Sequence, residues 1–295
     1  MATPAFGAGD HFFEADHVRF HYRVGGSGPL IIAHSVGWGM PGSYLWNGLG
    51  PHLEQNHTVI YFEPRANGQT SKPSDETSMS SKMMAEDIEH LRKHLGVDII
   101  PVLLGHSNGA CIVLRYAEVH PTHVGKLILI DAEIHDSPPN DNFQQWAAKR
   151  KDDPVYSEAL AALAGAMQNP PSDDAGFAEM MERILPWYFS DTTHVSTLQK
   201  HIDAEVTPPG VWAFLRQSKF DREPANRLPH VGDGRKVTAK TLILWGKEDA
   251  MCSLTAANSV AQAIDDASLI LVDFAGHMPW IEKPDEFWKA VDDFL

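Results

Sequence analysis

The chain has 295 residues, of which 43% are apolar and 21% charged, a length suited to one large α/β domain with an insertion. Its 24 basic and 39 acidic side chains give a net charge of −15, which argues against a nucleic-acid partner and against binding to anionic membranes. No apolar run reaches the ~18 residues of a membrane span, and the start of the chain lacks a signal-peptide pattern, so we expect a cytoplasmic protein.

Apolar runs alternate with amphipathic segments along the first part of the chain. This alternation is typical of an α/β protein with a mostly parallel sheet covered by helices on both faces. Such sheets bind ligands in the loops at the carboxyl ends of their strands. The predicted elements are a hairpin (11–24), strands at 30–34, 58–62, 99–104 and 127–130, and helices at 43–55, 80–95 and 108–120.

The pattern changes between residues 133 and 236, where short apolar strands disappear and helix-like segments are separated by prolines. Strand and helix patterns then return at 241–245, 254–264, 268–274 and 285–295. We therefore predict a core domain formed by residues 1–132 and 237–295, interrupted by a helical cap at 133–236.

A first chemical motif is Gly105-His106-Ser107-Asn108-Gly109, which matches Gly-x-Ser-x-Gly. The motif lies between a predicted strand and a predicted helix. In that context the glycines relieve crowding around a sharp turn that exposes the serine hydroxyl. We therefore predict Ser107 to be a nucleophile.

Two further residues can activate such a hydroxyl. His277 follows Gly276 in a loop after a predicted strand, and Asp249 lies a few residues beyond another strand end. A serine is a poor nucleophile until a base takes its proton, and a carboxylate is needed to orient that base. Asp131, at the end of the strand that precedes the insertion, and the nearby Glu133 stay open as alternative acids.

The order of serine, acid and histidine, with these flanking glycines, resembles the α/β-hydrolase superfamily. The resemblance is to its capped branch, which contains proline iminopeptidases, epoxide hydrolases and related esterases. It implies a triad of Ser107, Asp249 and His277. The sequence has no Walker-type lysine after a glycine loop and no His-Glu-x-x-His pattern, so we expect neither a cofactor nor a metal. Epoxide hydrolases carry aspartate at the position of this serine, so Ser107 counts against epoxide hydrolysis.

The loop after the first core strand departs from the family pattern. It reads His34-Ser35-Val36-Gly37-Trp38-Gly39, whereas relatives often have His-Gly-x-Pro-Gly. An oxyanion hole is expected to combine the backbone N–H of Asn108 with that of Val36 or Ser35.

The favoured function is hydrolysis of a carboxylic ester or lactone of a small-to-medium, hydrophobic substrate through an acyl-enzyme. Peptide or amide cleavage as in proline iminopeptidases, carbon–carbon bond hydrolysis, and ligand binding without turnover are the alternatives. The sequence does not give the oligomeric state. The predicted substrate-binding residues are His34, Gly37, Trp38, Met180, Trp187, Tyr188, Trp212 and Met278.

Overall fold

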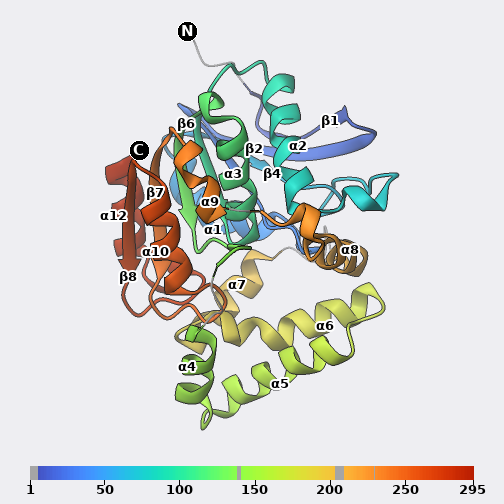
Figure 1. The fold of residues 1–295 in the computed structure, drawn as a ribbon, viewed down its shortest axis with the longest axis vertical. Coiled ribbons are helices and arrows are strands. Elements are labelled where there is room, and N and C mark those ends of the chain that lie inside the picture. The colour runs from blue at the N-terminus through green and yellow to red at the C-terminus, as the bar shows by residue number, and fades with distance from the viewer. Residues whose placement is uncertain (1–5, 138–140, 203–208, 229) are drawn as a thin grey trace.

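The computed structural model describes residues 6–137, 141–202, 209–228 and 230–295. Within these residues eight strands form one sheet in the order β1-β2-β4-β3-β5-β6-β7-β8 (Figure 1). β2 pairs antiparallel with β1 and β4, and the other neighbouring strands are parallel. The strands are β1 (Gly9–Ala15), β2 (Val18–Gly26), β3 (Leu30–His34), β4 (Thr58–Phe62), β5 (Ile100–His106), β6 (Val124–Ile130), β7 (Lys240–Gly246) and β8 (Ala267–Val272).

Helices cover both faces of the sheet because its central strands are apolar on both sides. In β3, Leu30 and Ile32 belong to one buried cluster, whereas Ile31 and Ala33 belong to another. The first cluster includes residues of α2, α3 and α10, and the second includes residues of α1 and α12. These helices are α1 (Ser43–Leu53), α2 (Ser81–His94), α3 (Asn108–Val119), α10 (Leu254–Ala263) and α12 (Pro284–Phe294).

The described residues between β6 and β7 contain helices and no strand. Figure 1 shows α4, α5 and α6 together at one end of the molecule. Tyr156 and Ile184 form a third buried cluster with Trp187 and with Ala250 of the following core segment. The helices are α4 (Asp141–Arg150), α5 (Pro154–Gln168), α6 (Asp174–Ile184), α7 (Val195–His201), α8 (Val211–Asp221) and α9 (His230–Asp233).

The parallel strands direct six loops to one edge of the sheet. The first residues after β3, β4, β5, β6, β7 and β8 are Ser35, Glu63, Ser107, Asp131, Lys247 and Asp273. Because these strands are parallel, the loops that carry the predicted site residues start at the same edge.

The predicted fold class, a mostly parallel sheet flanked by helices, is confirmed. Several predicted bounds differ from the structure by one to three residues. The strand predicted at 127–130 begins at Val124, and the helix predicted at 43–55 ends at Leu53. The strand predicted at 268–274 ends at Val272, because Phe274 has a φ of 55° and turns the chain away. The division into core and cap stays a prediction. None of the helices in the described part of the chain has the length and apolarity needed to cross a membrane.

Candidate active site

The turn between β5 and α3 holds Ser107 in a strained backbone conformation. Its φ is 54° and its ψ is −122°, a region that residues with side chains rarely adopt. A Cβ atom on Gly105 would lie 2.5 Å from the carbonyl oxygen of Gly109. A Cβ atom on Gly109 would lie 2.6 Å from the carbonyl oxygen of His34. The two glycines therefore allow the sharp turn that presents the serine at the start of α3.

A carboxylate and an imidazole from two other loops form a buried hydrogen bond. His277 Nδ1 lies 2.7 Å from Asp249 Oδ2, and both side chains are almost completely buried. The second carboxylate oxygen accepts the backbone N–H groups of Met251 and Cys252 at 2.7 and 3.1 Å. A carboxylate held in this way keeps a proton on Nδ1 and leaves Nε2 of the imidazole to accept one.

Close backbone contacts bring the loops of this pair together. A Cβ atom on Gly246 would collide with the carbonyl oxygen of Gly276, and one on Gly276 would lie 2.6 Å from the carbonyl oxygen of Tyr188. The backbone N–H of His277 donates to that same Tyr188 oxygen at 2.8 Å. The histidine loop is therefore fixed between the acid loop and the segment that follows α6.

The two alternative acids have other partners. Asp131 is fully buried and its Oδ1 accepts the N–H of Gly246 at 2.8 Å. Burial, and next the neighbouring Asp249 carboxylate, raise the pKa of Asp131 well above its usual value. Glu133 Oε2 accepts hydrogen bonds from Trp38 Nε1 and Asn108 Nδ2 at 2.9 and 3.1 Å. Of the three predicted acids, Asp249 is the one that bonds to the imidazole.

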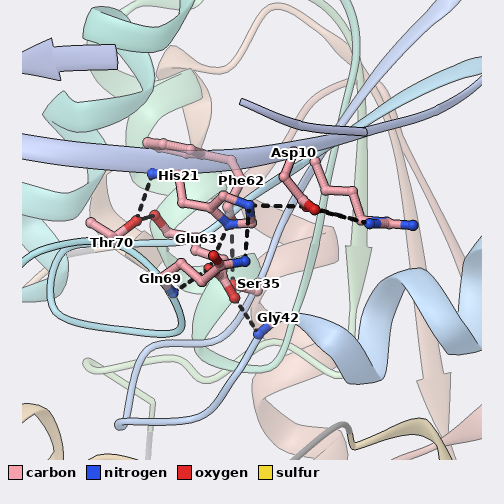
Figure 2. A network of polar contacts seen from close by, with 9 residues as sticks. Asp10, His21, Ser35, Gly42, Phe62, Glu63, Gln69 and Thr70 are labelled. Atoms are coloured by element: carbon pink, nitrogen blue, oxygen red, sulfur yellow. Dashed lines mark hydrogen bonds and ion pairs between the residues drawn. The ribbon is translucent and has the colours of Figure 1, made fainter. Parts of the chain in front are cut away.

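The two predicted oxyanion donors in the loop after β3 have different hydrogen-bond partners. The backbone N–H of Ser35 donates to the carbonyl oxygen of Phe62 at 3.0 Å, and its hydroxyl reaches the same oxygen at 3.2 Å (Figure 2). The prediction of Ser35 as an oxyanion donor is therefore wrong, because the sheet uses its N–H. The N–H of Val36 instead faces the hydroxyl of Tyr44, whose pKa is raised by burial.

Glu63 fixes the far end of the same loop. Figure 2 shows its buried carboxylate, which accepts the N–H of Gly42 at 2.8 Å and that of Gln69 at 2.7 Å. His21 Nδ1 lies 2.7 Å from the same group. Residues 35–42 are therefore tied to the sheet at both ends, which limits the movement of any N–H group between them.

Ser107 and His277 line one cavity of about 380 Å³. Most of its other lining residues are apolar, and they come from the core loops and from α5, α6, α7 and α8. As the first residue of α3, Asn108 has a backbone N–H without an acceptor inside the helix. The arrangement provides a hydroxyl, a base, an acid and hydrogen-bond donors around a mainly apolar space.

Two groups within the described residues could offer three ligand atoms to a metal ion. One consists of Asp249, Cys252 and His277, where the carboxylate already bonds to the imidazole and to two N–H groups. The other contains Glu89, whose carboxylate already forms an ion pair with Arg92. Neither arrangement implies a metal.

A family model described as "alpha/beta hydrolase fold" matches residues 28–284. The chain belongs to this family. The α/β-hydrolase chain is 24% identical over 291 residues to "Proline iminopeptidase PfmaB" of Pestalotiopsis fici, with 96% of this chain and 98% of the relative covered. It is 26% identical over 284 residues to 2-hydroxy-6-oxo-6-phenylhexa-2,4-dienoate hydrolase of Comamonas testosteroni, with 93% and 90% covered. The esterase of Exiguobacterium antarcticum has the same fold, with a TM-score of 0.72 at 22% identity over 98% and 99% of the two chains.

Four of the predicted substrate residues of this α/β hydrolase line the cavity, namely Trp38, Met180, Tyr188 and Met278. The other four are absent from the described lining, which corrects the prediction. The imidazole of His34 is buried behind the loop, and Gly37 approaches Gln217 and Asn108 instead. Trp187 belongs to the third buried cluster, and Trp212 packs against the first cluster at the surface.

Sequence reasoning missed the role of His106, the residue before the serine. Its ring packs 4.7 Å from that of His277, and its Nε2 donates to the His277 carbonyl oxygen at 2.9 Å. Nδ1 lies 3.1 Å from the Tyr44 hydroxyl. Burial lowers the pKa of His106 far below its usual value, so the ring is a neutral spacer that supports the base. The motif Gly-x-Ser-x-Gly leaves the residue before the serine open, so a single sequence gives no sign of such a role.

Glu282, on the short helix α11 (Pro279–Glu282), was also missed. Its Oε2 accepts the N–H of Gly276, next to the imidazole, at 2.5 Å. Its Oε1 accepts the N–H groups of Ser190 and Asp191 at 2.8 and 3.1 Å. One buried carboxylate therefore joins the histidine loop to the end of the helical segment.

Proposed function

We propose that this α/β hydrolase is a serine hydrolase that cleaves a carboxylic ester or lactone of a small-to-medium, hydrophobic substrate. The observation that carries the proposal is the buried hydrogen bond between His277 Nδ1 and Asp249 Oδ2, at a cavity that Ser107 also lines. A strained serine at a strand-to-helix turn supports the same assignment, since this geometry exposes a nucleophile.

In the proposed reaction, His277 Nε2 takes the hydroxyl proton as Ser107 Oγ attacks the carbonyl carbon, and Asp249 stabilises the imidazolium. The N–H groups of Asn108 and Val36 stabilise the oxyanion, each donor contributing about 10²–10³-fold. The carbon–oxygen bond to the leaving group then breaks, and the imidazolium protonates the departing alkoxide. Water, deprotonated by the same imidazole, releases the acid from the acyl-enzyme.

The lining of the cavity supports a flexible apolar substrate. Half of the ten methionines of the chain line this one space. Methionine has three rotatable bonds and a polarisable sulfur, so it adapts to apolar groups of different shapes. Two of these methionines lie on α6, within the predicted cap. The five are Met40, Met180, Met181, Met251 and Met278.

Carbon–carbon bond hydrolysis is the second candidate. It would use the same hydroxyl, imidazole and carboxylate, and the relative from Comamonas testosteroni carries the name of a dienoate hydrolase. The iminopeptidase alternative has less support. Its amino-terminal substrate needs carboxylates in the cap, yet Glu179 and Glu182 are exposed and absent from the described lining, and Glu205 lies outside the described residues.

Labelling with a fluorophosphonate tests the nucleophile. The wild-type chain is expected to form one covalent adduct, which tandem mass spectrometry maps to Ser107, and the Ser107→Ala variant is expected to form none. His277→Asn serves as a second variant, because loss of the base slows labelling without removing the hydroxyl. A wild-type chain that folds but resists labelling would favour a ligand-binding protein without turnover.

Substrate panels then separate the hydrolase classes. Initial rates are compared among p-nitrophenyl esters, a simple lactone, a 2-hydroxy-6-oxo-dienoate and a proline anilide. We expect the largest kcat/KM for an ester or lactone, rising with the apolar surface of the acyl group. A higher value for the dienoate would replace the proposal with the second candidate.

A further inference from the structure

A buried amide on α8 joins the two parts of the proposed oxyanion hole. Gln217 is fully buried, and its Oε1 accepts the backbone N–H of Trp38 at 2.6 Å. Its Nε2 donates to Asn108 Oδ1 at 2.9 Å and lies 3.2 Å from Ser81 Oγ. One side chain therefore contacts both the loop after β3 and the residue that follows the serine.

The side chain of Asn108 completes this link. Its Oδ1 also accepts the N–H of Gly37 at 3.3 Å, and its Nδ2 donates to Ser81 Oγ and Glu133 Oε2 at 3.0 and 3.1 Å. If the side-chain amide of Asn108 were rotated by half a turn, its NH₂ group would face the two N–H donors that Oδ1 now accepts. The network therefore permits only one orientation of this amide. Such a fully bonded, buried network is rigid.

The network also explains the glycine in the loop. A Cβ atom on Gly37 would lie 2.2 Å from Gln217 Oε1 and 2.9 Å from Asn108 Oδ1. The loop therefore approaches the two amides as closely as a residue without a side chain allows. The neighbouring N–H of Val36, the proposed second oxyanion donor, is held through this contact.

We propose that Gln217 is a positioning residue for the oxyanion hole, setting the distance between the N–H groups of Val36 and Asn108. The inference rests on the proposed function, because it assigns Gln217 to that same site. Two donors act on one oxyanion only if both lie about 3 Å from it, and a misplacement of about 1 Å can cost about 10²-fold in rate. A residue of the predicted cap thereby contributes to the chemistry of the core.

Asp221 provides a matched control on the same helix. It lies one turn after Gln217, and its two oxygens accept the N–H and the hydroxyl of Ser81 at 2.7 and 2.8 Å. It holds α8 to the same core residue without a bond to the loop after β3. If Gln217 served only to dock the helix, removing either contact would have the same effect.

Steady-state kinetics of Gln217→Met and Asp221→Asn, on an ester that the wild type hydrolyses, test the proposal. We expect Gln217→Met to lower kcat and kcat/KM together by about 10–100-fold, with KM within about threefold. Asp221→Asn should stay within about threefold in both, and thermal melting would show that both variants fold. Equal losses in the two variants, or a wild-type kcat in Gln217→Met, would overturn the assignment.

A conservative variant adds a signature that a purely structural role would not produce. In Gln217→Glu the ionised carboxylate faces Asn108 Oδ1 without a proton to donate, whereas the protonated acid presents both an acceptor and a donor. Its activity relative to the wild type at the same pH should therefore rise as the pH falls. A constant ratio would contradict the proposal.

Hydrogen–deuterium exchange separates this inference from the proposed function. The peptide covering residues 35–41 should exchange faster in Gln217→Met than in the wild type or Asp221→Asn. This measurement needs no turnover, so it tests the positioning of the loop even if no substrate is cleaved. Unchanged exchange would refute the positioning, whereas failure of Ser107 to label would refute the function.

Discussion

The two sides of the cavity are built from different interactions. Ser107 and His277 reach it from loops of the sheet edge, where hydrogen bonds fix their positions. α5 and α6 reach it with apolar side chains such as Leu163, Met180 and Ile184. Hydrogen bonds are directional and apolar contacts are not. The core therefore holds the proposed reacting groups in place, while these two helices shape the proposed substrate space.

The helix α8 departs from this division. Gln217 and Asp221 bind the core through buried hydrogen bonds, while Phe214 and Ser218 of the same helix line the cavity. One helix thus belongs to both sides. Gln217 is expected to affect turnover and Asp221 only to hold the helix in place, whereas the cavity-lining residues are expected to affect substrate choice.

The largest expected effect is a difference between the variants of two neighbouring carboxyl groups, Asp249 and Asp131. Asp249→Asn should lower kcat by about 10³–10⁴-fold, because an amide cannot hold the imidazole tautomer or stabilise its cation. Asp131→Asn should change kcat by less than about threefold, because its amide oxygen can still accept the N–H of Gly246. Rates for the best ester decide the matter, and equal losses would show that Asp131 shares the role of the acid.

A smaller effect is expected on the helical side. Met180→Ala removes apolar contact from the cavity and should raise KM about three- to tenfold for a long acyl chain. That factor corresponds to about 0.7–1.4 kcal/mol, less than the ~1.5–3 kcal/mol of a fully buried methionine, because Met180 is partly exposed. The loss should shrink for acetyl esters, and kcat should stay within about threefold. Met83→Ala, on α2 outside the described lining, is the matched control. A fall in kcat with unchanged KM would place chemistry, not selectivity, on α6.

The last expected effect concerns the free energy of unfolding at low pH and is nearly absent at pH 7. It comes from a histidine buried in the core. Burial lowers the pKa of His34 to about 4, below 6.5 in the unfolded chain. Between these values the unfolded state binds more protons, so this contribution is intact above pH 6.5 and is lost as the pH falls towards 4. The loss at pH 4.5 is about 2–3 kcal/mol.

Urea unfolding of the wild type and His34→Gln at pH 7 and 4.5 measures this contribution. The variant should lose about 2–3 kcal/mol less than the wild type between the two pH values. Asp131, whose pKa is raised by burial, acts in the opposite direction, but it is present in both proteins and cancels in the difference. Identical pH dependence would show that His34 is not the titrating group.

Several features could be predicted from sequence because they depend on local chemistry. The strands Leu30–His34 and Thr58–Phe62 were predicted at their observed bounds, since apolar runs end sharply at polar loops. The helix predicted at 80–95 was found at Ser81–His94, since its apolar residues recur at helical spacing. The turn at Ser107 was recognisable because Gly105 and Gly109 avoid a clash that a side chain would make with nearby backbone atoms.

Contacts between distant segments could not be predicted in the same way. Ser35 is adjacent to Val36 in sequence, yet the N–H of Ser35 donates to Phe62 at the end of β4, whereas that of Val36 faces the Tyr44 hydroxyl. Trp187 resembles a substrate residue by its type, but its neighbours from α5 place it in a buried cluster. Neither outcome depends on the residue itself.

The sequence by itself determined the alternation of strands and helices and the candidate serine, histidine and acids, because periodicity and side-chain chemistry are local properties. Only the tertiary structure decided which carboxylate bonds to His277, that the N–H of Ser35 bonds to Phe62, and that Gln217 connects α8 to the loop after β3. These contacts depend on the packing of segments that are separated in sequence, by 27 residues for Ser35 and Phe62 and by 179 for Trp38 and Gln217. A hydrogen bond across that distance is specified by the whole fold.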